Sequence, residues 1–254
     1  MKKMLFCAAI GLAVASVSLH AEETREYEIG DGFVLELTGH QKYLLDNYQK
    51  YLNRTRNWAR YDYYAAANAE QAKGAKAVFM GNSITQGWLD SRPEFFAKND
   101  LVGRGISGQT TYQMLARMQS DVVDLAPEYV VILAGTNDMA CNDGVISKHH
   151  IVENIKSMCE IAKANGIKPV VCSVLPVYEY PWRKELGLMA DHVRELNVLL
   201  KDYATQSGAL YVDYHSATQD ERGGLPEHLS HDGVHLKADG YAIIEGVILE
   251  ALGL

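Results

Sequence analysis

Cysteine is scarce in this sequence, and the cysteines cannot all pair with one another. The 254 residues include four cysteines, and one of them, Cys7, lies in an N-terminal segment that we expect to be removed. The odd number that remains (Cys141, Cys159 and Cys172) excludes a complete disulfide framework within one chain. We expect Cys159 and Cys172, in a predicted helix and a predicted strand, to be buried free thiols. No Cys/His cluster has the spacing of zinc ligands.

Long apolar runs are missing after the first 21 residues, and the run at the start is too short to cross a bilayer. It consists of Lys2 and Lys3, an apolar stretch from about Met4 to Val17, and small and polar residues that end at Ala21. This pattern is typical of a secretory signal peptide. The sequence therefore predicts a signal peptide at residues 1–21, a secreted or periplasmic protein, and no stable membrane anchor.

Basic residues are outnumbered by acidic ones. There are 24 Lys and Arg against 32 Asp and Glu, which gives a formal net charge of −8 at pH 7. Removal of residues 1–21 takes away two lysines and no acidic residue, so that 22 stand against 32 and the net charge becomes −10. An acidic surface of this kind argues against nucleic acid and against anionic lipid as partners.

The rest of the chain alternates between strand-like and helix-like patterns. Short apolar runs, typical of strands buried on both faces, occur at 77–80, 100–103, 129–134, 169–175 and 210–214. Helical patterns separate or follow them at 111–123, 145–165, 188–206 and 238–252. This alternation predicts an α/β fold with a parallel sheet that helices cover on both faces. We expect residues 76–254 to form this domain.

Residues 22–75 precede the first predicted buried strand. Within them, residues 41–72 have a helical pattern in which Tyr43, Tyr48 and Trp58 are among the apolar residues that recur at helical spacing. A tyrosine-rich stripe is compatible with a sugar platform, but such stripes are more often buried faces. We therefore expect residues 22–75 to form an N-terminal arm and a helix that packs on the domain.

Ser83 lies at the mouth of a turn after the first buried strand. The apolar run stops at Gly81, which permits a sharp turn, and Ser83 follows two residues later. Ligands bind beyond the carboxyl ends of parallel strands, so a serine at this point is placed for nucleophilic chemistry. Serine alone is a weak nucleophile, which needs a base and a group that orients the base. Without these partners, Ser83 is an ordinary helix-capping residue.

Three further loops supply the partners that such a serine needs. Gly108 lies in a glycine-bearing loop after the second strand, where a backbone N–H can face a cleft, and Asn137 closely follows the third strand. Asp232 and His235 precede the last helix, and their spacing of three, with Gly233 between them, lets one turn aim both side chains the same way. A nucleophile, a base, an orienting carboxylate and oxyanion donors are the parts of an ester hydrolase.

Four blocks in this order resemble the SGNH, or GDSL-like, hydrolase family: G-N-S-I-T from residue 81, I-S-G-Q-T-T from 106, G-T-N-D from 135 and D-G-V-H from 232. The resemblance covers about residue 78 to the C-terminus. It implies a nucleophile at Ser83, a triad completed by Asp232 and His235, and an oxyanion hole made by the N–H groups of Ser83 and Gly108 and the amide of Asn137. It also implies a three-layer α/β/α, flavodoxin-like fold with five parallel strands in the order 2-1-3-4-5, and catalysis without a metal or other cofactor.

One residue departs from the family pattern. The family usually has aspartate before the serine, whereas this chain has Asn82. We expect Asn82 to hold the turn through side-chain hydrogen bonds, with substrate contact as an alternative. Tyr178 and Trp182 follow the fourth strand, where loops shape pockets, and they are candidates for a substrate wall or for plain packing. His231, in the loop before Asp232, is another candidate for substrate contact.

Together these residues predict a secreted serine esterase that hydrolyses short-chain esters through an acyl-enzyme. The resemblance to the acetylhydrolase and carbohydrate acetylesterase branches favours O-acetyl groups on carbohydrates, so the expected partner is a small-molecule or glycan ester. A lysophospholipase or acyl-thioesterase is the alternative of the same class. A non-catalytic glycan-binding module, and a metal site built on Asp232, His235 and nearby histidines, are alternatives of other classes. The sequence leaves the oligomeric state undetermined.

Overall fold

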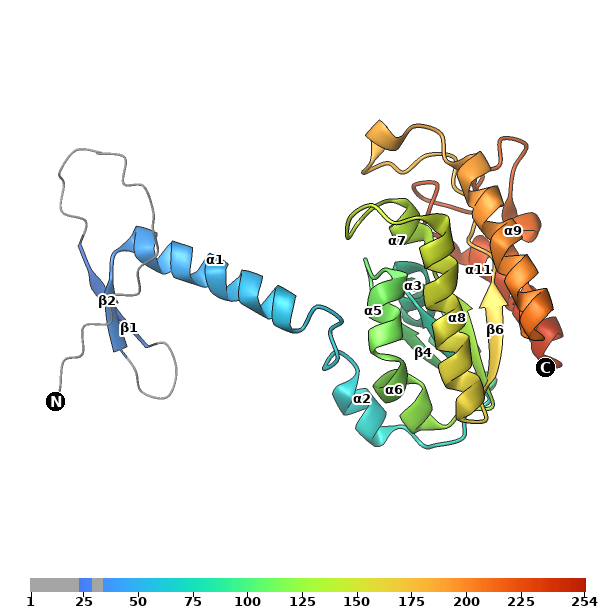
Figure 1. Ribbon diagram of the computed structural model, residues 1–254, viewed down its shortest axis with the longest axis horizontal. Helices are drawn as coiled ribbons and strands as arrows, with labels where there is room; N and C mark the ends of the chain where they lie inside the picture. The colour runs from blue at the N-terminus through green and yellow to red at the C-terminus, as the bar shows by residue number, and fades with distance from the viewer. Residues whose placement is uncertain (1–22, 29–33) are drawn as a thin grey trace. The chain divides into compact units, whose positions relative to one another are not determined.

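A parallel sheet lies at the centre of the larger part of the chain (Figure 1). The computed structural model describes residues 23–28 and 34–254. The strands of this sheet are β3 (Ala77–Gly81), β4 (Leu101–Gly105), β5 (Tyr129–Leu133), β6 (Lys168–Cys172) and β7 (Leu210–Val212). Their spatial order is β4-β3-β5-β6-β7, and all neighbours are parallel. The predicted fold class and the order 2-1-3-4-5 are therefore confirmed.

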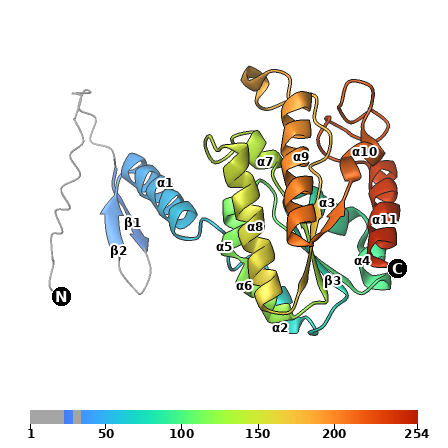
Figure 2. The ribbon, with the colours of Figure 1, turned by 45° about the vertical axis from the view of Figure 1, so that its right-hand side comes forward.

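Helices cover both faces of this sheet, as Figure 2 shows. One face carries α5 (Thr111–Ala116), α6 (Met118–Asp121), α8 (Lys148–Ala164) and α9 (Ala190–Ser207), and the other carries α3 (Ser83–Ser91), α4 (Pro93–Lys98) and α11 (Ala238–Leu252). Val78 and Met80 pack in the core under the first set, whereas Ala77 and Phe79 pack in the core under the second. Successive side chains of a strand point to opposite faces, so β3 has to be apolar throughout.

Some element boundaries differ from the expected ones. The strand expected at 169–175 ends at Cys172, because the backbone of Val174 is hydrogen-bonded to the Asn197 side chain rather than to a neighbouring strand. Asn197 Oδ1 accepts the Val174 N–H at 2.7 Å, and Asn197 Nδ2 donates to the Val174 carbonyl at 2.9 Å. The helix expected at 111–123 is divided into α5 and α6 at Arg117. Further short elements of the sheet domain are α7 (Thr136–Met139), α10 (Tyr214–Thr218), η1 (Val123–Leu125) and η2 (Lys184–Leu186).

A buried tyrosine couples the last helix to the helix that begins at Ser83. Tyr241 of α11 donates its hydroxyl to the Ile84 carbonyl at 2.9 Å, in the first turn of α3. Trp88 of α3 stacks on Tyr241 with ring centroids 5.8 Å apart, and it is fully buried. The loop that carries His235 leads directly into α11, so these contacts hold that loop close to the start of α3.

The expected buried thiols are present on this scaffold. Cys159 and Cys172 are free and buried, whereas Cys141 is free and half-buried. Burial raises the pKa of Cys159 to about 11 and that of Cys172 to about 12, which keeps both thiols protonated at neutral pH.

The N-terminal part of the chain departs further from the expectation. β1 (Arg25–Glu28) and β2 (Val34–Leu37) pair in antiparallel fashion. The single helix expected at 41–72 is wrong: the structure has α1 (Gly39–Arg56) and α2 (Ala65–Glu70), with a turn between them. The chain forms two compact units that meet between Arg56 and Asn57 along the sequence. Residues 57–75 therefore belong with the sheet domain rather than with an arm of residues 22–75.

The tyrosine-rich stripe on α1 is exposed at the positions that the structure describes. Within the unit that ends at Arg56, Tyr43, Leu44 and Tyr48 are all exposed, so this unit does not by itself bury the face that their spacing predicts. That α1 packs on the sheet domain stays a prediction, and the signal peptide at residues 1–21 lies outside the described residues. In the part of the chain that the structure describes, no helix combines the length and the apolar character that crossing a bilayer requires.

Candidate active site

Ser83 is placed by a sharp turn between β3 and α3. Asn82 is the N-cap of α3, and its Oδ1 accepts the Ile84 N–H at 3.0 Å. This bond confirms the expected turn-holding role of Asn82, whose side chain is buried and is therefore poorly placed for substrate contact. Ser83 is the first residue of α3, so its backbone N–H has no acceptor within the helix. The positive end of the helix dipole at this point favours a negative charge on a bound group.

The Ser83 hydroxyl lies beside an oriented imidazole. Ser83 Oγ is 2.9 Å from His235 Nε2, and His235 Nδ1 is 2.8 Å from Asp232 Oδ2. Asp232 Oδ1 accepts the backbone N–H groups of Val234 at 3.0 Å and His235 at 2.8 Å, so one short turn aims both side chains. Burial raises the pKa of Asp232, but the hydrogen bonds from His235 and Val234 outweigh it and the pKa lies below its ordinary value. The carboxylate is therefore ionised at neutral pH.

The loop of Gly108 packs directly on the turn of Ser83. A Cβ on Gly105 would lie 2.3 Å from Gln86 N and 2.6 Å from Asn82 O, which is closer than any side chain allows. Gly108 has φ +80°, in the left-handed region that favours glycine. Two glycines thus let this loop reach the turn and then reverse, and the N–H groups of Ser83 and Gly108 belong to two segments in contact.

Asn137 is held by hydrogen bonds at both ends of its amide. Its Nδ2 donates to the Gln109 carbonyl at 2.9 Å, and its Oδ1 accepts Asn142 Nδ2 at 2.9 Å. The side chain is buried in the first turn of α7, which follows β5 after a two-residue connection. An amide nitrogen carries two N–H groups and the bond to Gln109 uses one of them. The second N–H is available as a donor next to the Gly108 loop.

Asp138 ties the same helix to the loop that precedes α5. Its carboxylate accepts the Thr111 N–H at 3.0 and 3.1 Å and the Thr111 hydroxyl at 2.5 Å. Burial raises the pKa of Asp138, against the hydrogen bonds from Thr111 that lower it. The loops of Gly108 and Asn137 are therefore joined by two separate contacts.

Trp182, one of the expected substrate contacts, lies beside His235. Its ring centroid is 6.3 Å from that of His235, and the side chain is 41% exposed. Tyr178 lies instead under the Arg222 guanidinium, which is 5.2 Å from its ring centroid, so this contact favours packing. His231 is exposed in the loop before Asp232.

Two residues near the site were not expected there: Asn142 was not singled out from the sequence, and Trp58 was noted only in the helical pattern of residues 41–72. Asn142 holds the amide of Asn137 and also accepts Trp182 Nε1 at 3.0 Å. Trp58 donates its Nε1 to Asp143 at 2.8 Å, so a residue that precedes all four sequence blocks reaches the loop after α7. Asn142 could have been found from the sequence, because it follows the Gly-Thr-Asn-Asp block at a short distance along the chain. Trp58 carries no such signal, because its contact joins residues 85 positions apart.

A metal centre has no obvious set of ligands here. Among the residues that the structure describes, no three His, Cys, Asp or Glu side chains are grouped so that they could share a metal ion. Asp232 and His235 are directed at each other, and the other ring nitrogen of His235 is directed at Ser83. The arrangement can transfer a proton from a serine to an oriented histidine and can present several N–H groups to a developing negative charge.

Comparison with known proteins agrees with this geometry. A model of the GDSL-like Lipase/Acylhydrolase family matches residues 79–243, which include all four loops. A solved GDSL-like lipase from Bacteroides thetaiotaomicron is 43% identical, with a TM-score of 0.74 over 77% of this chain and 98% of that chain. An acetylxylan esterase from Geobacillus stearothermophilus is 25% identical over 60% of this chain and 72% of that protein.

A lipoprotein of Bacillus subtilis called YqeF, described as uncharacterized, is 39% identical over 32% of this chain. This match spans only 34% of the length of YqeF. An N-acylneuraminate cytidylyltransferase from Escherichia coli is 24% identical over 68% of this chain, a match that spans only 39% of that protein. The family model, by contrast, covers well over half of this chain and includes both the nucleophile turn and the histidine turn. The chain belongs to the GDSL-like lipase/acylhydrolase family.

Proposed function

We propose that this protein is a serine esterase in which Ser83 is the nucleophile, His235 the general base and Asp232 the residue that orients the base. The observation that carries the proposal is the continuous contact from Ser83 Oγ to His235 Nε2 at 2.9 Å and from His235 Nδ1 to Asp232 Oδ2 at 2.8 Å. A carboxylate at Nδ1 leaves Nε2 free to accept the serine proton. A module that only binds glycans would not need a serine in contact with an oriented imidazole.

The proposed reaction proceeds through an acyl-enzyme. Ser83 Oγ attacks the ester carbonyl carbon while its proton passes to His235 Nε2, and the carbonyl oxygen becomes an oxyanion near the N–H groups of Ser83, Gly108 and Asn137. The C–O bond to the alcohol then breaks, and His235 gives its proton to the leaving oxygen. Water next attacks the acyl-enzyme as His235 takes one of its protons. Collapse of this second intermediate releases the carboxylic acid, and Ser83 recovers its proton.

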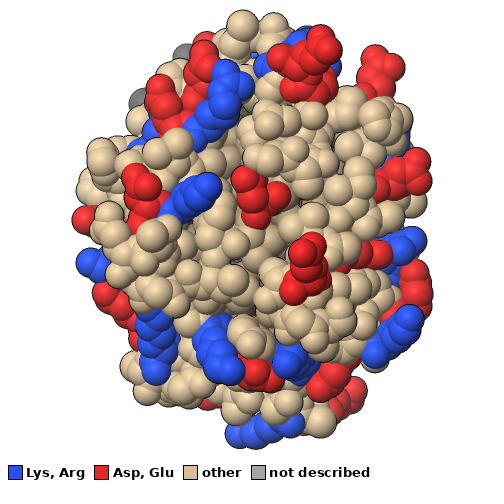
Figure 3. Space-filling view, turned by 90° about the vertical axis from the view of Figure 1, so that its right-hand side faces the viewer, with Lys and Arg blue, Asp and Glu red and all other residues tan. Residues whose placement is uncertain are grey.

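We infer that the natural substrate carries a short acyl group, acetyl in the first instance, on a carbohydrate. Two observations support this inference: the relative from Geobacillus stearothermophilus is named an acetylxylan esterase, and the half-exposed Trp182 ring lies beside His235. An indole has an apolar face and a polar edge, which suits a sugar with both C–H and O–H groups. On the face shown in Figure 3, acidic and basic side chains are interspersed, so this face has no continuous basic patch of the kind that binds nucleic acid.

The test compares acyl lengths and then natural polymers. Hydrolysis rates are measured for p-nitrophenyl acetate, butyrate and octanoate, with Ser83→Ala as the inactive control, and acetate release is measured on acetylated xylan. The proposal predicts the highest rate on acetate and release of acetate from the polymer. Equal or higher rates on octanoate would favour the lysophospholipase or thioesterase alternative. Binding to glycans without hydrolysis of any ester would favour the binding module.

We also propose that the protein is secreted or periplasmic and that residues 1–21 are removed. The support is the basic and then apolar pattern of that segment and the description of the Bacillus subtilis relative as a lipoprotein. Expression of the full chain in a Gram-negative host, followed by fractionation and N-terminal sequencing, tests this proposal. An uncleaved chain in the cytoplasm would contradict it.

A further inference from the structure

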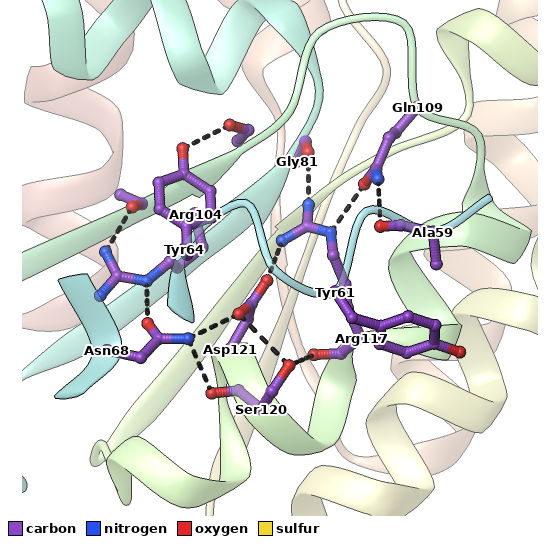
Figure 4. A network of polar contacts seen from close by, with 12 residues as sticks. Ala59, Tyr61, Tyr64, Asn68, Gly81, Arg104, Gln109, Arg117, Ser120 and Asp121 are labelled. Atoms are coloured by element: carbon purple, nitrogen blue, oxygen red, sulfur yellow. Dashed lines mark hydrogen bonds and ion pairs between the residues drawn. The ribbon is translucent and has the colours of Figure 1, made fainter. Parts of the chain in front are cut away.

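One buried guanidinium bridges two segments of the site. Arg117 lies between α5 and α6, and its side chain is fully buried. Its Nε donates to Gln109 Oε1 at 2.6 Å, its Nη2 donates to the Gly81 carbonyl at 3.0 Å, and its Nη1 forms an ion pair with Asp121 at 2.8 Å. Figure 4 shows these three bonds leaving one planar group in three directions.

Both uncharged acceptors belong to segments that carry proposed oxyanion donors. Gly81 is the last residue of β3 and comes two residues before Ser83. Gln109 directly follows Gly108, and its own carbonyl accepts the Asn137 amide at 2.9 Å. The guanidinium therefore contacts two of the three donor segments directly and reaches the third through a single residue.

We propose that Arg117 is a positioning residue of the oxyanion hole, which sets the relative placement of the Ser83 and Gly108 N–H groups and of the Asn137 amide. This inference rests on the proposed esterase function. Oxyanion donors act only when they lie about 2.7–3.1 Å from the oxygen that becomes charged, and a misplacement of about 1 Å can cost roughly 10²-fold in rate. Lysine cannot replace the arginine, because a single ammonium lacks the rigid planar fork that reaches three acceptors.

The buried charge of Arg117 depends on a partner inside the protein. Burial lowers the pKa of Arg117, while the hydrogen bond and the charge of Asp121 raise it, so the charge needs its partner. Asp121 in turn accepts Asn68 Nδ2 at 2.7 Å, and the network therefore includes a residue of α2. Buried ion pairs can often be replaced by apolar residues without loss of stability. A geometric role in the site is a reason to keep the pair.

Arg104 offers a matched control. It is also a buried arginine, and its Nε donates to Asn68 Oδ1 at 2.7 Å while its Nη1 donates to the Gly103 carbonyl at 2.8 Å. Gly103 lies in β4, five residues before Gly108, and Asn68 also donates to Asp121, so Arg104 belongs to the same network but bonds neither the Gly81 carbonyl nor the Gln109 side chain. Arg104→Lys should therefore perturb the Asp121 end of the network while the bonds of Arg117 to Gly81 and Gln109 stay in place.

The experiment compares Arg117→Lys, Gln109→Ala and Arg104→Lys with the wild-type chain. Three quantities are measured for each: the Tm, kcat and KM on p-nitrophenyl acetate well below the Tm, and the rate at which a p-nitrophenyl phosphonate labels Ser83. Phosphonylation places a charged oxygen where the oxyanion forms. Arg117→Lys and Gln109→Ala should lower kcat by about 10- to 100-fold with little change in KM, and should slow labelling by a similar factor. Arg104→Lys should keep kcat within about twofold at a comparable loss of Tm.

Two results would overturn the inference: a folded Arg117→Lys enzyme with wild-type kcat and labelling rate, or an Arg104→Lys enzyme that loses as much kcat. If Arg117→Lys does not fold, Gln109→Ala decides, because it removes the acceptor of Nε and leaves the ion pair with Asp121 intact. A wild-type chain that hydrolyses no ester would overturn the proposed function together with this inference. An active wild type with equally active Arg117 and Gln109 variants would overturn the inference alone.

Discussion

Removal of the Asn137 amide is the cleanest test of the oxyanion hole, because it is the one proposed donor that belongs to a side chain. Asn137→Ala deletes the donor while the backbone N–H groups of Ser83 and Gly108 stay in place. Loss of one such donor typically costs about 10²–10³ in kcat, or roughly 2.7–4 kcal/mol. KM should change little, since the interaction strengthens only as charge develops on the oxygen.

The contacts of Asn137 also predict a cost in stability. The truncation removes the bonds to the Gln109 carbonyl and from the Asn142 amide, both 2.9 Å long. A buried polar group that loses its partner costs about 1–3 kcal/mol, but Asn142 is exposed, so water can satisfy its amide. The kinetic measurement therefore has to be made well below the Tm of the variant.

Asn142→Ala serves as the matched variant for this prediction. It removes the group that orients the Asn137 amide but keeps the donor itself, so we expect a smaller loss of kcat than in Asn137→Ala. Steady-state kinetics on p-nitrophenyl acetate measure kcat and KM for both variants, and thermal unfolding measures their stability. If Asn137→Ala kept nearly full kcat with a raised KM, the residue would be a substrate clamp and the oxyanion assignment would be wrong.

Three further predictions test the nucleophile, the loop contact and a buried acid. Ser83→Ala should lower kcat by several orders of magnitude with the Tm near that of the wild type, and an acyl group mapped by mass spectrometry to any other residue would contradict the assignment. Gly105→Ala should lower both Tm and kcat, because its Cβ would lie 2.3 Å from Gln86 N. Gly246→Ala is the control, since a Cβ there meets no neighbouring group within 4 Å, and it should lower neither. Equal Tm values for the two variants would refute the close approach at Gly105. Because burial raises the pKa of Asp138, its contribution to stability is complete below the unfolded pKa of about 3.9 and is lost as pH rises through the folded pKa. Urea unfolding from about pH 4 to 7 should therefore show Asp138→Asn gaining stability relative to the wild type, and a pH-independent difference would contradict this.

The sequence alone predicted the order of the strands in the sheet domain and the residues of the candidate site. Strands such as β3 and β5 are short apolar runs that end at glycine or in a polar loop, and each depends mainly on its own residues. The four blocks that carry Ser83, Gly108, Asn137 and His235 are likewise local patterns. Parallel strands bring their carboxyl ends to one edge of a sheet, so the residues that follow them could be expected to meet.

Tertiary structure decided what depends on contacts between distant segments. Ser83 and His235 are 152 positions apart, and their 2.9 Å contact requires the packing of α11 on α3. The division of the expected helix at Arg117 leaves no mark in the local sequence, since neither glycine nor proline occurs at 111–123, yet it places a guanidinium between Gly81 and Gln109. Helical spacing likewise could not show that the tyrosines of α1 are exposed within their own compact unit. Periodicity reports which face of a helix is apolar, whereas burial depends on what the rest of the chain brings against that face.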